Sequence, residues 1–324
     1  MQVSKQIDMI PEQALTWYRT GRGAALATVV QTWGSAPRRV GAQLAVSGAG
    51  DMAGSVSGGC VEGAVVLAAQ DAIQTGRPEM LEFGISDGDA FAVGLACGGT
   101  IRVLVEPVGT HLPEAVLADL VAARATRQPV AYVTGVDKAP RLETDGHADR
   151  LRMDRSGFED DGQTFVAIHN PPLRLVVVGA VHIAQALVPM ARVAGYDVVV
   201  IDPRAAFASP ERFPDSTLLD DWPDEAARDF GLDARTALVL LTHDPKLDDP
   251  ALIVALHSDV FYIGALGSKR THAARLERMA AQGFDQAALA RIHGPVGLNI
   301  GAAGPAEIAV SILAQMTRVL RLGA

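Results

Sequence analysis

The chain has 324 residues, of which 49% are hydrophobic and 20% charged, and its formal net charge is −9. This length predicts two domains, and the acidic balance argues against nucleic acid as the main partner, because neutralising phosphates needs a basic face. No apolar stretch reaches the roughly 18 residues of a membrane span, and residues 1–11 lack a signal core. We therefore expect a cytoplasmic protein with no membrane partner.

The N-terminal residues predict a short helix followed by a pair of strands. The helix is expected over residues 11–19, and the strands over 24–32 and 43–46. Arg38 and Arg39 stand among small residues in the loop between the strands. Guanidinium groups are planar, permanently charged donors, so this loop suits an anionic ligand. An ordinary solvated turn is the alternative.

The segment Ser57-Gly58-Gly59-Cys60-Val61-Glu62 carries one of the two cysteines of the chain. Its glycines would let a bulky ligand approach the sulfur and the neighbouring amides closely. The apolar spacing that follows predicts a helix ending at Gly76, which places Cys60 at or just before a helix N-terminus. The helix dipole there favours an anion by about 0.3–1 kcal/mol, so we expect a raised thiolate fraction.

The second cysteine stands in Ala96-Cys97-Gly98-Gly99, just before residues 100–105, which predict a buried strand. The chain has no Cys-x-x-Cys motif and no histidine pair near either cysteine, which excludes a disulfide framework and a structural zinc site. Both cysteines are expected to be reduced. Each is either a small buried hydrophobe or, as the flanking glycines suggest, a ligand-presenting thiol, and the sequence leaves both interpretations open.

Composition divides the chain into an N-terminal domain over residues 1–135, a polar connector over 136–170 and a C-terminal domain over 171–324. The C-terminal domain opens with a near-continuous apolar strand, which is typical of a parallel sheet. Its predicted strands cover 173–178, 197–201, 237–241 and 260–263, and its predicted helices 182–194, 247–257, 271–281 and 306–320. The predicted class is α/β, a C-terminal Rossmann-like doubly wound parallel sheet preceded by a smaller N-terminal α+β domain.

The first strand-to-helix turn of the C-terminal domain is an incomplete dinucleotide fingerprint. Gly179 is in place, but Val181 stands where a glycine normally lets the backbone approach a pyrophosphate, which weakens the case for a bound nucleotide. Asp202 lies near the spacing at which a carboxylate holds a ribose hydroxyl, whereas Arg204 would meet a phosphate instead. His182, at the helix start, either faces a ligand phosphate or caps and packs.

Two further segments follow strands of this sheet, at the edge where such sheets bind ligands. Gly267-Ser268-Lys269-Arg270 is similar to an anion cradle, with a glycine for access, a helix N-terminus and two cations. His243 with Asp244 would form an acid/base pair, and an ordinary turn is the other interpretation.

Several blocks of the chain match one family in the right order. They are Gly34-Ser35 with Pro37-Arg38-Arg39, Gly54 through Glu62, Gly94-Leu95 with Cys97-Gly98-Gly99, Asp202-Pro203-Arg204, Tyr262-Ile263-Gly264 with Gly267-Ser268, and Gly297-Leu298 through Glu307-Ile308-Ala309. Through these blocks, nearly the whole chain resembles the xanthine dehydrogenase accessory protein family, XdhC/CoxI. It departs from the family pattern at Val181, where glycine is usual, and at Asn299, where aspartate is usual.

The resemblance implies a dedicated chaperone without turnover of its own. Such a protein binds molybdenum cofactor in its molybdopterin form and protects it while a cysteine desulfurase replaces an oxo ligand by sulfur. It then delivers the cofactor to an apo xanthine dehydrogenase or a related molybdenum hydroxylase. The family resemblance and the apolar C-terminal helix also predict a homodimer.

A soft thiolate suits a molybdenum centre, and the cofactor's phosphate needs amide and basic donors. The candidate cofactor-binding residues are therefore Arg38, Arg39, Gly58, Gly59, Cys60, Cys97, Gly98, Gly99, Gly179, His182, Asp202, Arg204, Gly267, Ser268, Lys269 and Arg270. Cys60 and Cys97 are the candidate metal ligands, and no residue is assigned a catalytic role.

Two other functions stay open at this point. One is an NAD(P)-dependent oxidoreductase that uses the C-terminal domain, with His243 or Lys269 as acid/base. The other is a thiol-dependent sulfur transferase with Cys60 as the nucleophile.

Overall fold

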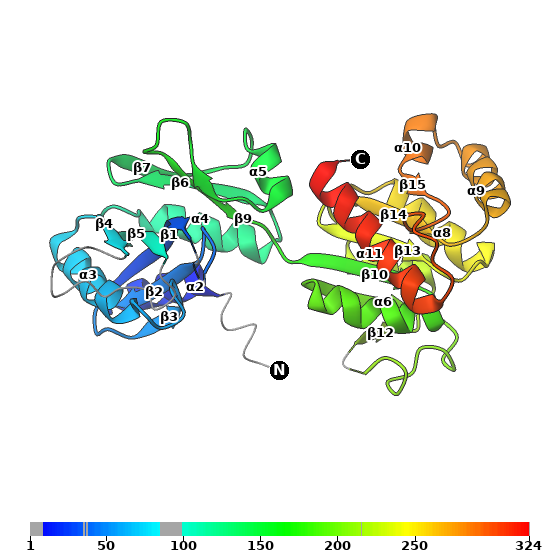
Figure 1. Ribbon diagram of the computed structural model, residues 1–324, viewed down its shortest axis with the longest axis horizontal. Coiled ribbons are helices and arrows are strands. Elements are labelled where there is room, and N and C mark those ends of the chain that lie inside the picture. The colour runs from blue at the N-terminus through cyan, green and yellow to red at the C-terminus, as the bar shows by residue number, and fades with distance from the viewer. Residues whose placement is uncertain (1–8, 35, 37, 85–98, 215, 324) are drawn as a thin grey trace. The chain divides into compact units, whose positions relative to one another are not determined.

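The computed structural model describes residues 9–34, 36, 38–84, 99–214 and 216–323. The chain divides into two compact units, Met1–Pro171 and Pro172–Ala324. Figure 1 shows them in colours running from blue to green and from green to red. The expected α/β class is confirmed, with antiparallel sheets in the N-terminal unit and a Rossmann-like parallel sheet in the C-terminal unit.

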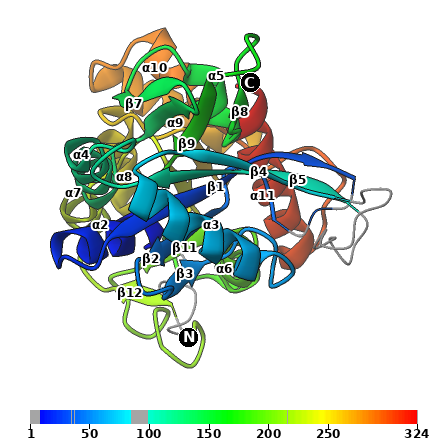
Figure 2. The ribbon, with the colours of Figure 1, turned by 90° about the vertical axis from the view of Figure 1, so that its left-hand side faces the viewer.

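A five-stranded antiparallel sheet forms the centre of the N-terminal unit. In spatial order its strands are β3 (Met52–Gly54), β2 (Gln43–Ser47), β1 (Ala24–Trp33), β5 (Thr100–Pro107) and β4 (Glu79–Phe83). β1 is buried from Ala24 to Val30 because its alternate side chains pack on opposite faces. One face packs on α2 (Ile10–Arg19) and the other on α3 (Glu62–Thr75), which lies in front of the sheet in Figure 2.

A second antiparallel sheet completes this unit. Its strands, in spatial order, are β7 (Lys138–Glu143), β6 (Val130–Gly135), β9 (Phe165–His169) and β8 (Gly157–Phe158). Two helices accompany it, α4 (Glu114–Ala125) and α5 (Ala148–Met153). Residues 136–170 therefore belong to a sheet of the N-terminal unit and are not the expected connector. β7 is an edge strand in which only Pro140 is buried, so its composition is close to that of a linker.

A buried carboxylate joins the two sheets. Glu106 of β5 has no exposed surface, and it accepts hydrogen bonds from Tyr132 Oη at 2.8 Å and from Thr134 Oγ1, both on β6. His111 Nε2 lies 3.4 Å from the same carboxylate oxygen. Burial, together with this carboxylate, raises the pKa of Tyr132 well above its usual value. The tyrosine therefore stays protonated and keeps donating across the sheets.

The C-terminal unit is built on a six-stranded parallel sheet. In spatial order the strands are β12 (Thr217–Leu219), β11 (Tyr196–Ile201), β10 (Leu173–Val178), β13 (Thr236–Leu240), β14 (Tyr262–Ala265) and β15 (Ile292–His293). The strand order reverses between β10 and β13, which is the switch point where such sheets bind ligands. The continuous apolar run predicted for residues 173–178 is β10, and it is buried on both faces.

Helices cover both faces of this parallel sheet. One face packs on α6 (His182–Val193) and α11 (Pro305–Leu322). The other packs on α7 (Pro223–Phe230), α8 (Pro245–Leu256), α9 (Lys269–Ala281) and α10 (Gln286–Ala290). Within the described part of the chain, no helix combines the length and the apolarity needed to cross a bilayer.

Candidate functional site

The five-stranded sheet brings together segments that are far apart in the sequence. β1 ends at Trp33, opposite Thr100, the first residue of β5, and β3 ends beside the start of β2. The described residues between β1 and β2 (34, 36 and 38–42), the loop 55–61 and Gly99 therefore lie at the same end of this sheet. They include the described parts of three of the blocks singled out in the sequence.

Cys60 lies in the loop between β3 and α3, two residues before the helix begins at Glu62. It is a free, half-buried thiol that packs against the hydrophobic cluster beneath α3. The predicted helix is confirmed, and it ends at Gly76 with a left-handed φ of 71°. On the other side of Cys60 in the chain, Gly59 has a φ of 116°, and a Cβ placed on it would meet no atom of the described residues within 4 Å. The described part of the chain therefore leaves the space beside Gly59 open.

The loop before Cys60 is folded around the carboxylate of Glu62. This side chain accepts hydrogen bonds from Ser55 Oγ at 2.6 Å, Val56 N at 3.2 Å, Ser57 N at 2.9 Å, Gly58 N at 3.1 Å, Gly59 N at 2.8 Å and, in addition, Ser57 Oγ. Burial alone raises the pKa of Glu62, but these hydrogen bonds outweigh it and lower the pKa to about 2. The carboxylate is therefore ionised at neutral pH, and it engages the amides of Gly58 and Gly59.

Arg38 and Arg39 differ in their surroundings although they are neighbours. Arg38 is half-buried, and its Nε is buried with no hydrogen-bond partner among the described residues. Arg39 is exposed. A buried guanidinium nitrogen without a partner is costly, so Arg38 is the better placed of the two to receive an acceptor from a ligand.

The second cysteine segment is described only in part. Cys97 and Gly98 lie outside the described residues, and Gly99 is a buried residue at the entrance to β5. Within the described ranges, no group of three or more His, Cys, Asp or Glu side chains could hold a metal ion.

In the C-terminal unit, Gly179 follows β10 at the switch point. Its φ is 106°, and a Cβ there would lie 2.7 Å from Thr242 Cγ2, so the position requires glycine to let the ends of β10 and β13 approach. Val181 is the N-cap of α6 with an extended backbone, and His182, the first residue of the helix, is exposed.

Asp202 is fully buried, and both of its carboxylate oxygens are engaged. It accepts hydrogen bonds from the backbone N–H of Ala180 at 2.9 Å and of Arg204 at 3.0 Å, and it pairs with the Arg204 guanidinium at 2.8 and 2.7 Å. Burial raises the pKa of Asp202, and the hydrogen bonds from Arg204 and Ala180 lower it further than burial raises it. The carboxylate thus fastens Arg204 to the turn after β10 and presents no unbound oxygen to a ribose.

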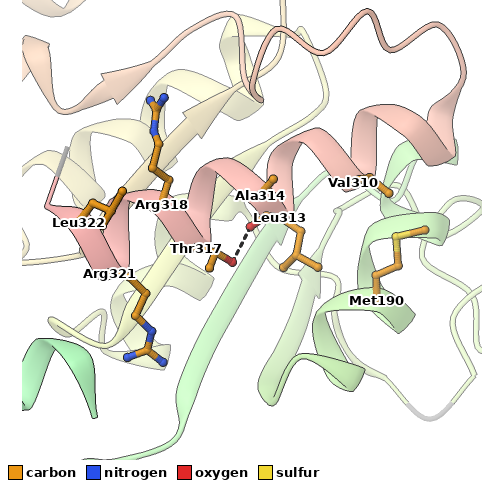
Figure 3. Close-up of a pocket in the computed structure, with 8 residues that line it drawn as sticks. All are labelled: Met190, Val310, Leu313, Ala314, Thr317, Arg318, Arg321 and Leu322. Carbon is orange, nitrogen blue, oxygen red and sulfur yellow. Dashed lines mark hydrogen bonds between the residues drawn. The ribbon is translucent and has the colours of Figure 1, made fainter. Parts of the chain in front are cut away.

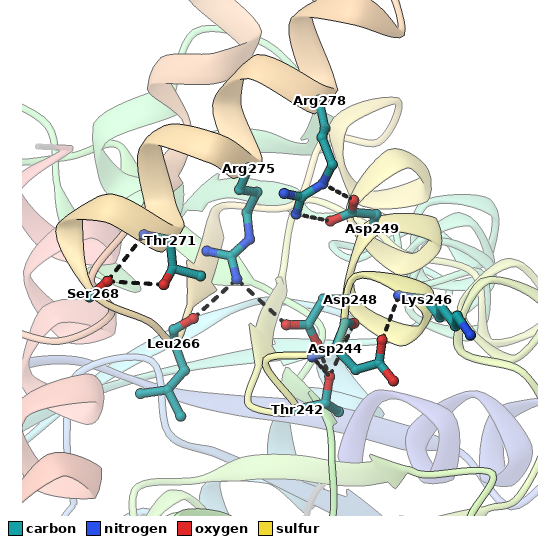
Figure 4. A network of polar contacts seen from close by, with 10 residues as sticks. All are labelled: Thr242, Asp244, Lys246, Asp248, Asp249, Leu266, Ser268, Thr271, Arg275 and Arg278. Carbon is teal, nitrogen blue, oxygen red and sulfur yellow. Dashed lines mark hydrogen bonds and ion pairs between the residues drawn. The ribbon is translucent and has the colours of Figure 1, made fainter.

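The predicted anion cradle is the N-terminus of α9. Ser268 caps this helix by accepting the N–H of Thr271 at 3.1 Å, and Lys269 and Arg270 are exposed. Beneath the loop, Arg275 is 2% exposed and donates to the carbonyl of Leu266 at 3.0 Å. Figure 4 shows the guanidinium between this loop and α8.

Arg275 also pairs with Asp248 of α8, at 3.5 Å. Asp248 accepts a hydrogen bond from Thr242 Oγ1 at 2.6 Å, and burial raises its pKa. Next to it, Asp244 is the N-cap of α8, and His243 is exposed with a φ of 63°. The sequence allowed either an acid/base pair of His243 and Asp244 or an ordinary turn. The structure shows a turn, in which Asp244 accepts a hydrogen bond from the backbone N–H of Lys246 and not from His243.

An apolar groove of about 590 Å³ runs along α11 and reaches α6 (Figure 3). The residues that line it are Met190, Val310, Leu313, Ala314, Thr317, Arg318, Arg321 and Leu322. This is the outer side of the apolar helix from which a homodimer was predicted. The dimer itself remains a prediction.

Comparisons with known proteins agree with the two-unit architecture. Residues 175–316 match the XdhC Rossmann domain, and residues 17–84 match the XdhC and CoxI family. Over 304 residues the chain is 31% identical to the molybdenum cofactor insertion chaperone PaoD of Escherichia coli K12, a match that covers 93% of this chain and 84% of PaoD. The chain belongs to the XdhC and CoxI family.

Other relatives of this XdhC and CoxI family member extend the comparison. A probable xanthine dehydrogenase subunit from Bacillus subtilis 168 is 28% identical over 313 residues, covering 90% of this chain and 92% of that protein. The crystal structure of a xanthine dehydrogenase from Bacillus halodurans aligns with a TM-score of 0.61 at 28% identity, covering 97% of this chain and 96% of the other.

The prediction from sequence missed the role of Glu62. It assigned Gly58 and Gly59 to a ligand, whereas in this XdhC and CoxI family member their N–H groups bind Glu62. A signal was present in the sequence, because serines and glycines that precede a glutamate in a helix's first turn can close a loop onto its carboxylate.

Proposed function

We propose that the protein is a molybdenum cofactor insertion chaperone that matures a xanthine dehydrogenase or a related molybdenum hydroxylase. The observation that carries the proposal is the half-buried free thiol of Cys60, which follows Gly59, where a Cβ would meet no atom of the described residues within 4 Å. Support also comes from membership in the XdhC and CoxI family and from the relative named as such a chaperone. The molybdopterin form of the cofactor is the cargo of this protein, so no turnover is required of it.

The residues present fit a cargo of this kind. A thiolate is a soft ligand and suits a molybdenum centre that keeps the cofactor's own ligands. Arg38 offers a buried guanidinium nitrogen without a partner among the described residues, at the same end of the sheet, which suits an anionic group of the cargo. Within the C-terminal unit by itself, Lys269 and Arg270 at the N-terminus of α9 are a separate candidate site for a phosphate.

The proposal also states that the protein protects its cargo while the cargo is sulfurated. It further assigns the protein two partners. A cysteine desulfurase supplies sulfur as a persulfide, and the apo form of the client enzyme receives the product. Exchange of an oxo ligand for sulfido uses one persulfide and two further thiols. It releases one water, one thiol from the persulfide carrier and one disulfide, so two electrons come from the added thiols.

The test is anaerobic titration of the purified protein with molybdenum cofactor, followed by ultrafiltration and metal counting. Wild type, Cys60→Ala and Cys97→Ala are compared with Leu67→Ala, which alters an exposed side chain of α3 and serves as the control. We expect about one cofactor per chain in wild type and control and loss of retention in Cys60→Ala. Failure of the wild type to retain cofactor would overturn the proposal.

The same protein preparations discriminate the two alternatives. An oxidoreductase would bind NAD(P)H in calorimetry and change its absorbance with a substrate, but Asp202, the candidate ribose ligand, is bound to Arg204 and Ala180. A sulfur transferase would keep cofactor after alkylation of Cys60 and lose only transfer. Loss of retention on alkylation supports the chaperone.

A further inference from the structure

The loop that presents Cys60 is organised around a carboxylate of the chain itself. We infer that Glu62 is a positioning residue, whose carboxylate fills an anion nest made by residues 55–59 and so fixes where Cys60 stands. The inference deepens the proposed function, and it rests on that function only in its last step, the retention of cargo.

The nest is a concave arrangement of the N–H and O–H donors of residues 55–59, and an anion bound in it accepts their hydrogen bonds. Successive backbone N–H groups in turn conformations form such concavities, and they bind anions in many proteins. Here two serine hydroxyls add to four backbone N–H groups. Glu62, the first residue of α3, turns its side chain back into this concavity and is only 6% exposed.

The carboxylate holds the chain on both sides of Cys60. On one side, Gly59 donates its N–H to Glu62 Oε2 at 2.8 Å. On the other, Val61 donates its N–H at 2.9 Å to Ser57 Oγ, which itself donates to the same carboxylate oxygen. The residues on both sides of Cys60 therefore have backbone N–H groups that the Glu62 carboxylate holds, directly at Gly59 and through Ser57 at Val61.

The two glycines before Cys60 make the conformation of the loop depend strongly on the carboxylate of Glu62. Gly58 and Gly59 both have positive φ, and neither has a side chain that would restrict the backbone if the carboxylate were removed. A glutamine at position 62 would place its NH2 group against N–H donors, and an aspartate would be one methylene too short to fill the nest. Without the carboxylate the loop loses its conformation, and the half-buried thiol becomes more accessible.

The test measures alkylation of Cys60 by iodoacetamide. Cys97→Ala is the background, so that Cys60 is the sole thiol of the chain. Glu62→Ala and Glu62→Gln are compared with Glu79→Ala, an exposed glutamate of β4, over a pH series and with or without acetate. Thermal melting establishes that each variant is folded.

We expect alkylation of Cys60 to accelerate about tenfold in Glu62→Ala and Glu62→Gln, because the hydrogen bonds that hold the loop are lost. Acetate should enter the empty nest of Glu62→Ala and restore the wild-type rate and pH profile. Acetate should leave the faster alkylation of Glu62→Gln unchanged, since the glutamine blocks the nest, and it should not alter the rate of the control. Folded Glu62 variants that alkylate at the wild-type rate would overturn the inference, as would an acceleration in Glu62→Ala that acetate leaves unchanged.

Cofactor retention is then measured in the same variants. If the wild type retains no cofactor, the proposed function fails, while the alkylation result still decides whether Glu62 positions Cys60. If the wild type retains cofactor, Glu62→Ala should lose it and recover it with acetate. Undiminished retention by Glu62→Ala, despite faster alkylation, would show that positioning by Glu62 does not serve the cargo.

Discussion

Asp202 and Arg204 face each other in a two-point ion pair, with Arg204 Nε 2.8 Å from Oδ1 and Nη2 2.7 Å from Oδ2. The aspartate has no exposed surface, whereas the side chain of Arg204 is 39% exposed and lies over the ring of Phe207. The pair thus ties the chain after β11 to the turn after β10, through Ala180.

Removal of Arg204 should therefore weaken the C-terminal unit. In Arg204→Ala the buried charge of Asp202 keeps only backbone donors, and we expect a loss on the order of 2 kcal/mol, less than for a fully buried pair because Arg204 is partly solvated. Hydrogen exchange of peptides from β10 and β11 in urea measures it. Arg228→Ala, which breaks an exposed pair with Asp224, should cost under about 0.5 kcal/mol. Equal losses in both variants would contradict this account.

The same substitution at the neighbouring residues Arg38 and Arg39 tests which arginine contributes to cofactor retention. Arg38 has a buried nitrogen without a partner among the described residues and Arg39 is exposed, so the same change at the two positions should have unequal effects. We expect Arg38→Ala to weaken retention about tenfold and Arg39→Ala less than about threefold, in the ultrafiltration assay at fixed salt. A larger effect at Arg39 would show that the loop acts through surface charge.

Glu62 should make the N-terminal unit sensitive to acid. The pKa of this carboxyl is about 2 in the fold, whereas that of an unperturbed glutamate is 4.5. A lowered pKa stabilises the fold above the unfolded value, and the contribution disappears as the pH falls from 4.5 toward 2. We expect Glu62→Gln to cost up to about 3 kcal/mol near neutral pH and progressively less in acid, measured by urea unfolding at several pH values. A deficit that does not change with pH would contradict this prediction.

The predicted homodimer has a specific candidate surface in the groove along α11. α11 carries Glu307 in its first turn and Arg321 in its last, so two copies packed antiparallel place opposite charges side by side. We expect Val310→Glu, at a side chain 47% exposed in the groove, to reduce a dimeric mass in light scattering to that of one chain. Val193→Glu, 91% exposed and outside the groove, is the control. A dimer that survives Val310→Glu would place the interface elsewhere.

The sequence predicted the longer elements of the C-terminal unit because their signals are local, but it missed β12, α7, α10 and β15. The apolar run at 173–178 is β10 without a shift, and the helix predicted over 182–194 is α6, one residue shorter. Residues 136–170 were assigned to a connector from their polar composition, to which the edge strand β7 contributes. A polar edge strand and a linker have the same composition, and only pairing with β6 separates them.

The candidate site was predictable as a set of residues but not as a set of contacts. Cys60 and Arg38 were named from their neighbours in the chain, and strand pairing brings their loops to one end of a sheet. That Asp202 binds Arg204 and that Gly59 binds Glu62 depends on side-chain direction, which spacing alone does not give.

The filled nest before Cys60 also has a consequence for selectivity. Its N–H groups already hold a negative charge, so phosphate, sulfate and chloride find no vacant donors among the nest residues 55–59. The half-buried thiol of Cys60, next to Gly59 in the chain, is a soft donor that binds soft metals and does not bind anions. Small anions therefore find no backbone donors to occupy in residues 55–59, and under the proposed function a metal cargo would not have to displace them there.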